Sequence, residues 1–257
     1  MADYTTLTSD EIRSLLSHYN LGKPDSMIPM EGGQANSSIK ITTDQGVYIL
    51  SVCDEKNNEE VESLTRLLVY LKTRDFPTTR PVETNTGNYL ITHENKPVYL
   101  KEFIPGQVTR NLSCDMVNQL GKTLAGLHLL PPMEGMKDRF PYGIDFFDEA
   151  LESDFQHPYL EWLEEKKIYL EQAIDPGMKR GLIHGDIFWD NLVFSQGHLA
   201  AVLDFEEACH YYRLFDLGMC SVGCCSRKGS FDREKIKALI HGYQHHSPLT
   251  KEEKSQV

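Results

Sequence analysis

The chain has 257 residues, 40% of them hydrophobic and 25% charged, which is ordinary for a globular protein of one large domain or two lobes of about 100 to 150 residues. The net charge of −12 disfavours nucleic acid or an anionic membrane surface as a partner. The sequence has no apolar run of the roughly 20 residues that span a bilayer and no signal-peptide pattern at its start, so we expect a cytoplasmic protein. The six cysteines lack zinc-site spacing, which indicates reduced, mostly buried thiols.

The first hundred residues are predicted to be rich in strands. A helix is expected to begin after Thr8, which can form a capping box with Glu11. Apolar residues at helical spacing over 59–73 predict a second helix, inserted between two pairs of strands. Alternating side chains place these strands at 37–43, 47–52, 88–92 and 97–103.

A change of pattern follows at Ile104-Pro105-Gly106, where Pro and Gly interrupt regular structure. Beyond this joint the apolar spacing is mainly helical, and two short apolar runs at 192–194 and 199–205 form a predicted hairpin. We therefore expect an α+β fold of two lobes with a cleft between them, where ligands bind. The predicted helices of the second lobe are 111–130, 158–174 and 232–243.

Three oxygen-bearing side chains stand at the ends of short apolar runs in this second lobe: Asp186, Asn191 and Asp204. Phosphoryl transfer needs a carboxylate that orients the attacking hydroxyl and accepts its proton, and hard oxygen ligands that hold Mg²⁺ on the nucleotide phosphates. Asp186 suits the first role, while Asn191 and Asp204 suit the second. The predicted activity is therefore Mg²⁺- and ATP-dependent phosphorylation of a hydroxyl group.

The step from Asp186 to Asn191, followed by Asp204-Phe205-Glu206 after a strand, resembles the catalytic and metal-binding loops of the protein-kinase-like fold. His184-Gly185-Asp186 is the form found in the aminoglycoside phosphotransferase and choline kinase branch, which phosphorylates small molecules. The resemblance implies a nucleotide-binding lobe over 1–103, a small antiparallel sheet with one helix, and a helical catalytic lobe over 104–257. His184 is expected to brace the loop by hydrogen bonding.

Candidate nucleotide contacts lie in the first lobe. Glycines and small polar residues over 31–37 would let backbone N–H groups approach ATP phosphates, and the segment at 101–106 looks like the hinge whose main chain binds adenine. The individual candidates are Gly32, Gly33, Asn36, Ser37, Glu102 and Ile104. Ser51 stands where the fold usually carries a strand lysine; Lys56 is the candidate replacement, with Glu60 or Glu62 as its helix partner.

Over nearly its whole length the chain looks like a bacterial type II homoserine kinase. The resemblance implies transfer of the ATP γ-phosphoryl group to the side-chain hydroxyl of L-homoserine. That group also tends to lack lysine at the position of Ser51, and its members run on beyond Val257 into further helices. The resemblance therefore implies that the C-terminal lobe here is either truncated or lacks those helices. The matching blocks are 4–21, 31–37, 46–50, 182–194, 203–209 and 212–217.

Several alternatives remain open from the residues alone. A choline-like amino alcohol or an aminoglycoside is the next acceptor, because an acidic protein suits cationic substrates. The missing strand lysine and the short C-terminus also fit a nucleotide-binding pseudokinase. A metal-dependent hydrolase fits less well, since the sequence lacks a second histidine–carboxylate group. A homodimer is compatible with the sequence, which leaves the oligomeric state open.

Overall fold

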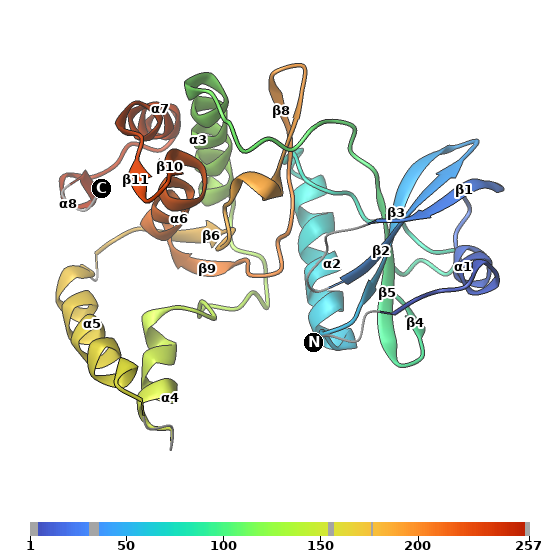
Figure 1. Ribbon diagram of the computed structural model, residues 1–257, viewed down its shortest axis with the longest axis horizontal. Helices are drawn as coiled ribbons and strands as arrows, with labels where there is room; N and C mark the ends of the chain where they lie inside the picture. Colours follow the sequence, from blue (N-terminus) through green and yellow to red (C-terminus); the bar gives the residue numbers. More distant parts are fainter. Residues whose placement is uncertain (1–4, 31–35, 154–156, 176, 255–257) are drawn as a thin grey trace. The chain divides into compact units, whose positions relative to one another are not determined.

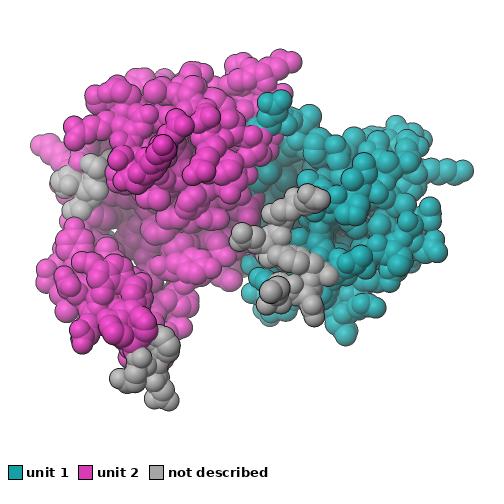
Figure 2. Space-filling model, in the orientation of Figure 1, with its two compact units in different colours: residues 1–107, 200–203 teal, residues 108–199, 204–257 magenta. Residues whose placement is uncertain are grey.

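The computed structural model describes residues 5–30, 36–153, 157–175 and 177–254. The chain divides into two compact units (Figure 2). Unit 1 comprises residues 1–107 and 200–203, and unit 2 comprises residues 108–199 and 204–257. The boundary predicted from the sequence lies between residues 103 and 104.

Unit 1 is built on an antiparallel sheet, whose five strands in the described part of the chain follow the order β1-β2-β3-β5-β4 (Figure 1). Thr43 of β2 pairs with Gly46 of β3, so the predicted hairpin has a two-residue loop and is confirmed. The bounds are β1 Pro24–Pro29, β2 Asn36–Thr43, β3 Gly46–Cys53, β4 Ile91–His93 and β5 Lys96–Glu102.

The strand predicted over 88–92 is the exception, because β4 begins only at Ile91. A local turn holds the preceding residues: the backbone N–H of Thr84 donates to the carbonyl of Asn88 at 2.7 Å, and the Asn88 N–H donates to the Thr84 hydroxyl at 3.1 Å. These bonds satisfy the backbone groups of Asn88 locally, so that residue does not join the sheet.

Helix α1, Ser9–Leu16, begins with the predicted capping box between Thr8 and Glu11. Its apolar side chains pack on one face of the sheet and form the core of unit 1. The buried residues of this core include Ile12, Leu15, Leu16, Ile39, Ile41, Leu50, Val52, Val98 and Leu100.

Helix α2, Asn58–Lys72, is the inserted helix and carries a second capping box, between Asn57 and Glu60.

Unit 2 is mainly helical. The predicted helices at 111–130, 158–174 and 232–243 are present as α3 Cys114–Leu129, α5 Tyr159–Ala173 and α7 Arg233–Gln244. The remaining helices of the described residues are η1 Ile144–Phe146, α4 Phe147–Leu151, η2 Trp189–Asn191, α6 Arg213–Cys225 and α8 Lys251–Lys254. Its short strands are β6 Arg180–Ile183, β7 Leu192–Ser195, β9 Cys209–Tyr212, β10 Ser226–Arg227 and β11 Ser230–Phe231, while β8 His198–Val202 begins in unit 2 and ends among residues 200–203 of unit 1.

Helices α3 and α7 lie side by side, with α6 beside them (Figure 1). Two glycines let the α3 and α7 backbones touch: a Cβ on Gly121 would stand 2.2 Å from the Leu239 carbonyl oxygen, and one on Gly242 would stand 2.1 Å from that of Asn118. This close approach brings buried polar side chains of the two helices within hydrogen-bonding reach of each other.

All six cysteines are free thiols, and five of them are buried, as the sequence indicated; Cys114 is exposed. Among the described residues, no helix combines the length and the apolar character that a bilayer span requires.

Candidate active site

Strand β6 carries the candidate catalytic loop. It pairs antiparallel with β9, from Arg180 opposite Tyr212 to Ile183 opposite Cys209. Leu182 and Ile183 are fully buried, so the strand end is fixed, and Asp186 follows three positions later in a half-buried place. Strand anchoring of this kind gives a catalytic side chain a defined direction.

Asn191, at the end of η2, lies against Asp186. Its amide nitrogen donates to the Asp186 main-chain oxygen at 2.9 Å and stands 3.4 Å from Asp186 Oδ2. The structure therefore brings two of the three predicted site residues together. Because the nitrogen end of the amide is directed to Asp186, Oδ1 is the end left to face a cation.

Asp204, the third predicted residue, is exposed and has a φ of 64°. Left-handed backbone is uncommon for residues other than glycine, but aspartate and asparagine tolerate it. The next residue, Phe205, is buried with its ring against that of His184, 4.5 Å between centroids. The segment that carries Asp204 thus packs beside the loop that carries Asp186.

The predicted bracing role of His184 is confirmed. Its side chain is fully buried, and its Nδ1 accepts the backbone N–H of Asp186 at 3.2 Å. Since Nδ1 accepts this bond, a proton on the neutral ring belongs to Nε2.

Asp216, a residue that the sequence analysis did not identify, holds the loop through hydrogen bonds to its backbone. Asp216 of α6 is fully buried, and its carboxylate accepts the backbone N–H of His184 at 2.7 Å and that of Gly185 at 2.8 Å. Burial by itself raises the pKa of Asp216, but the hydrogen bond and charge of His128, the charge of His184 and the hydrogen bond from the His184 N–H outweigh burial and lower it. The carboxylate is therefore ionised and acts as an acceptor only.

Gly185 makes this anchoring possible. Its φ is +86°, and a Cβ there would lie 2.8 Å from the Phe140 ring and 2.9 Å from the Glu207 carbonyl oxygen. Only glycine meets both conditions without strain, which explains the glycine between His184 and Asp186.

The donor set of the loop fits a hard divalent cation. An amide oxygen from Asn191 and a carboxylate from Asp204 are oxygen ligands of the type that Mg²⁺ takes, and no soft sulfur or imidazole ligand is among the predicted metal residues. Magnesium, when bound there, would neutralise phosphate charge during transfer.

In unit 1 the predicted phosphate-binding loop is only partly described. Gly32 and Gly33 lie outside the described residues. Asn36 begins β2. The N–H and hydroxyl of Ser37 both donate to Asp54 Oδ2, at 3.0 and 2.7 Å, so these two donors are already engaged. The nucleotide contacts assigned to this loop stay predictions.

Ser51 is fully buried, and its hydroxyl lies 3.3 Å from that of Ser38. Strand pairing places it on the sheet face opposite the α1 core, together with Lys40 of β2 and Lys101 of β5. These two lysines were not singled out by the sequence, because the shared face depends on strand register. Lys56 stands just before the N-cap of α2.

The proposed lysine partners lie on α2. Glu60 accepts the Asn57 N–H at 2.9 Å through its Oε2, within the capping box, while Glu62 is exposed. In the predicted hinge, the Glu102 N–H donates to the Arg80 carbonyl at 2.9 Å, and Ile104 is half-buried. The adenine contacts of Glu102 and Ile104 stay predictions.

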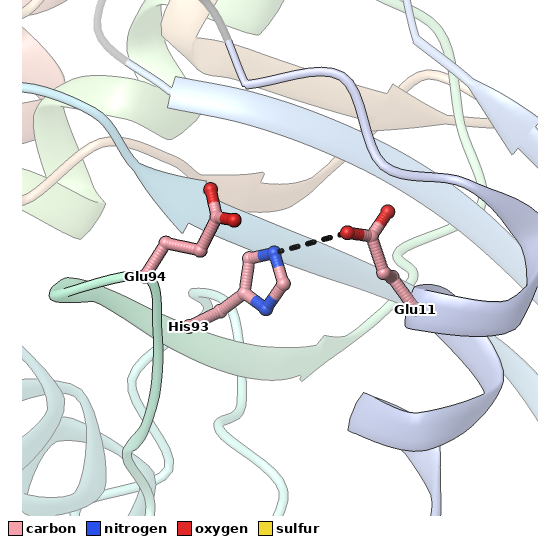
Figure 3. Close-up of side chains that lie close together, drawn as sticks. All are labelled: Glu11, His93 and Glu94. Carbon is pink, nitrogen blue, oxygen red and sulfur yellow. Dashed lines mark ion pairs between the residues drawn. The ribbon is translucent and has the colours of Figure 1, made fainter.

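A second polar cluster belongs to unit 1 and consists of Glu11, His93 and Glu94 (Figure 3). His93 Nε2 stands 3.9 Å from Glu11 Oε1, while Glu11 Oε2 accepts the Thr8 N–H and hydroxyl of the helix cap. The hydrogen bonds from Thr8 lower the pKa of Glu11. The capping box accounts for Glu11, and we assign this cluster no part in catalysis.

Comparison with known proteins agrees with this geometry. Residues 26–249 match the model of the phosphotransferase enzyme family. A homoserine kinase of Caulobacter vibrioides is 31% identical over 271 aligned positions, which cover 100% of this chain and 84% of that protein. An amicoumacin kinase in complex with AMP-PNP, Ca²⁺ and Ami superposes with a TM-score of 0.77 at 15% identity, over 95% of this chain and 79% of that one.

A microcompartment-associated aminopropanol kinase superposes with a TM-score of 0.71 at 19% identity, over 97% of this chain and 84% of that one. The fold and the loop define a phosphotransferase of the protein-kinase-like fold, as predicted. The chain belongs to the phosphotransferase enzyme family. Its predicted class, an ATP-dependent kinase that acts on a small-molecule hydroxyl, is confirmed.

Proposed function

We propose that this protein transfers the γ-phosphoryl group of ATP to the side-chain hydroxyl of L-homoserine. The hydroxyl oxygen forms a bond to the γ-phosphorus, the bond from that phosphorus to the bridging oxygen breaks, and ADP leaves. The hydroxyl proton passes to Asp186. The observation that carries the proposal is the loop of unit 2, where the Asp186 carboxylate stands beside the Asn191 amide, 3.4 Å away.

Each of the loop residues has a distinct task. Asp186 orients the hydroxyl and takes its proton, while its place after β6 and its N–H bond to His184 fix its direction. Asn191 and Asp204 supply the oxygen ligands for Mg²⁺. Asp204, in the left-handed region, is directed by the Phe205 contact with His184.

The homoserine assignment is supported by relatives that match this entire chain, including the homoserine kinase of Phenylobacterium zucineum at 30% identity. The loop itself recognises phosphate and metal chemistry, so the acceptor must be chosen elsewhere in the protein. The kinases that share the fold at lower identity include one for amicoumacin and one for aminopropanol, and the second makes an amino alcohol the competing acceptor.

An acceptor panel tests the substrate. ADP release and ³¹P NMR of the product would be measured with L-homoserine, choline, aminopropanol and an aminoglycoside at equal concentration. We expect L-homoserine to give the highest kcat/KM. A higher value with any of the other three would overturn the homoserine assignment, and no turnover at all, despite a rise in Tm with Mg·ATP, would favour a nucleotide-binding pseudokinase.

The role of Asp186 has its own test. Asp186→Asn should lower kcat between about a hundredfold and ten-thousandfold, because the amide accepts no proton, while the Mg·ATP-induced rise in Tm remains. Asp190→Asn is the matched control, since Asp190 lies in the same loop but is exposed. Equal loss of nucleotide binding and turnover in the Asp186 variant would contradict the assigned role.

A further inference from the structure

The hydrogen bonds that involve Asp216 extend to side chains on two neighbouring helices, α3 and α7. His128 of α3 is fully buried, and its Nε2 lies 3.0 Å from Asp216 Oδ2. On the other side of the ring, Nδ1 lies 2.8 Å from the hydroxyl of Tyr243 on α7. The Tyr243 side chain is 1% exposed, so both contacts are shielded from water.

Two hydrogen bonds on opposite sides of the ring hold His128. The ionised Asp216 carboxylate can only accept, so His128 Nε2 carries a hydrogen. The Tyr243 hydroxyl is the hydrogen-bond partner of Nδ1, so the two contacts together fix the orientation of the imidazole. Ser247, which is also buried, hydrogen-bonds the Tyr243 oxygen and acts as its donor.

The contact depends on the close packing of α3 and α7. Gly121 and Gly242 bring the two backbones together, and the sequence separation of His128 and Tyr243 is 115 residues. Removing the tyrosine hydroxyl would leave Nδ1 without its partner and free the ring to turn about its side-chain bonds. The hydrogen bond from Nε2 to the Asp216 carboxylate would then be weaker, and Asp216 would be held less firmly under the loop.

We infer that Tyr243 is a positioning residue for the phosphoryl transfer: its hydroxyl fixes the orientation of the His128 ring, whose hydrogen bond holds Asp216 under the His184–Gly185 backbone and so sets the place of Asp186. The inference rests on the proposed function for its catalytic readout. Tyr243 lies on a helix that contributes none of the predicted catalytic, metal or nucleotide residues. Its effect on the reaction passes through four consecutive hydrogen bonds, from Tyr243 to His128, Asp216, His184 and Asp186.

Tyr243→Phe removes only the hydroxyl and is the test variant. We expect kcat to fall about tenfold while KM for ATP stays within about twofold, since a tenfold change corresponds to 1.4 kcal/mol. Tyr19→Phe is the matched control, because it removes a buried tyrosine hydroxyl from the core of unit 1. The control should keep the wild-type kcat even where its Tm falls.

A spectroscopic arm makes the test independent of the substrate. The ¹H–¹⁵N signal of the His128 Nε2–H, in protein without ligand, should lie downfield in the wild type because of the hydrogen bond to Asp216, and should move upfield or be lost through exchange in Tyr243→Phe. An unchanged Nε2–H signal, or an unchanged kcat, in the Tyr243 variant would each overturn the inference. Failure of the wild type to phosphorylate homoserine would count against the proposed function alone, because the NMR measurement needs no turnover.

Discussion

The carboxylate of Asp216 accepts the backbone N–H of Gly185 at 2.8 Å, across 31 residues of sequence. The other oxygen of the same carboxylate accepts the backbone N–H of His184 at 2.7 Å. Helix α6 and the catalytic loop therefore share one buried, ionised side chain. Its removal should affect both the stability of unit 2 and the rate of phosphoryl transfer.

The first prediction concerns this side chain. In Asp216→Asn, one of the two side-chain ends becomes an NH₂ donor that faces a backbone N–H or the His128 ring. We expect the free energy of unfolding to fall by about 3 kcal/mol, with kcat at least about tenfold lower. Urea denaturation and steady-state kinetics would measure the two effects.

The control for that experiment is Asp115→Asn, where the exposed carboxylate accepts only the Gln119 amide at 2.9 Å in the described structure. This change should leave the free energy of unfolding within about 0.5 kcal/mol of wild type. An Asp216 variant as stable and active as the control would show that the two backbone contacts are not needed to hold the loop.

The second prediction concerns the metal ligands. Asn191→Ala and Asp204→Asn should each raise the Mg²⁺ concentration at half-maximal rate by at least about tenfold, because each removes one oxygen ligand or its charge. Asparagine is the suitable replacement for Asp204, since it also tolerates a φ of 64°. Activity would be titrated with Mg²⁺ at fixed ATP, with Asp190→Asn alongside, and an unmoved midpoint in either variant would remove that residue from the metal site.

Local chemistry made part of the structure predictable from the sequence. The capping box of Thr8 and Glu11 spans three residues, and the β2–β3 hairpin is set by a two-residue turn, so both signals lie within a short window. The step from Asp186 to Asn191 is similarly short, and the structure joins these residues directly. Patterns confined to one loop or one turn therefore predicted their own geometry.

Helix α6 was not predicted, and the reason lies in its composition. It contains Gly218, Gly223 and three cysteines, which are weaker helix formers than leucine or alanine, and packing in unit 2 stabilises it instead. The partners of Asp216 could not be predicted for a related reason. His128 lies 88 residues away, and only the packing of α3 on α6 joins them.

The choice of a lysine to replace the one usually found at the position of Ser51 shows the same limit of prediction from sequence. Lys56 was chosen for its nearness in sequence to Ser51, whereas Lys40 and Lys101 share a sheet face with Ser51 through strand register. Face identity follows from pairing across strands, and a single sequence does not contain the register of β5 on β3.

The third prediction separates these lysines. If Lys56 contacts the ATP phosphates, Lys56→Ala should raise KM for ATP at least about tenfold, while Lys72→Ala, an exposed change in α2, should leave it within about twofold. Initial rates over a range of ATP concentrations would measure KM. A rise confined to Lys40→Ala or Lys101→Ala would instead assign the phosphate contact to the Ser51 face.

The fourth prediction concerns the pH dependence of unit 1. Asp54, whose side chain is 2% exposed, accepts hydrogen bonds from Thr5, Ser37 and Lys96, with the Lys96 ammonium at 2.7 Å. Burial raises the pKa of Asp54, but the hydrogen bonds from Lys96, Thr5 and Ser37 outweigh burial and hold it below its ordinary value of 3.8.

Because the folded pKa is the lower one, the stabilisation is complete above the unfolded value of 3.8 and is lost as the pH falls through the folded value. Asp54→Asn should therefore lower the free energy of unfolding by about 2 kcal/mol at pH 7, and the difference from wild type should shrink as the pH falls below about 4. Urea denaturation at pH 7 and at low pH would measure it, with the exposed Asp25→Asn as control. A difference that stays constant down to the lowest pH at which the protein folds would show that the Asp54 charge contributes nothing to this hydrogen-bonded cluster.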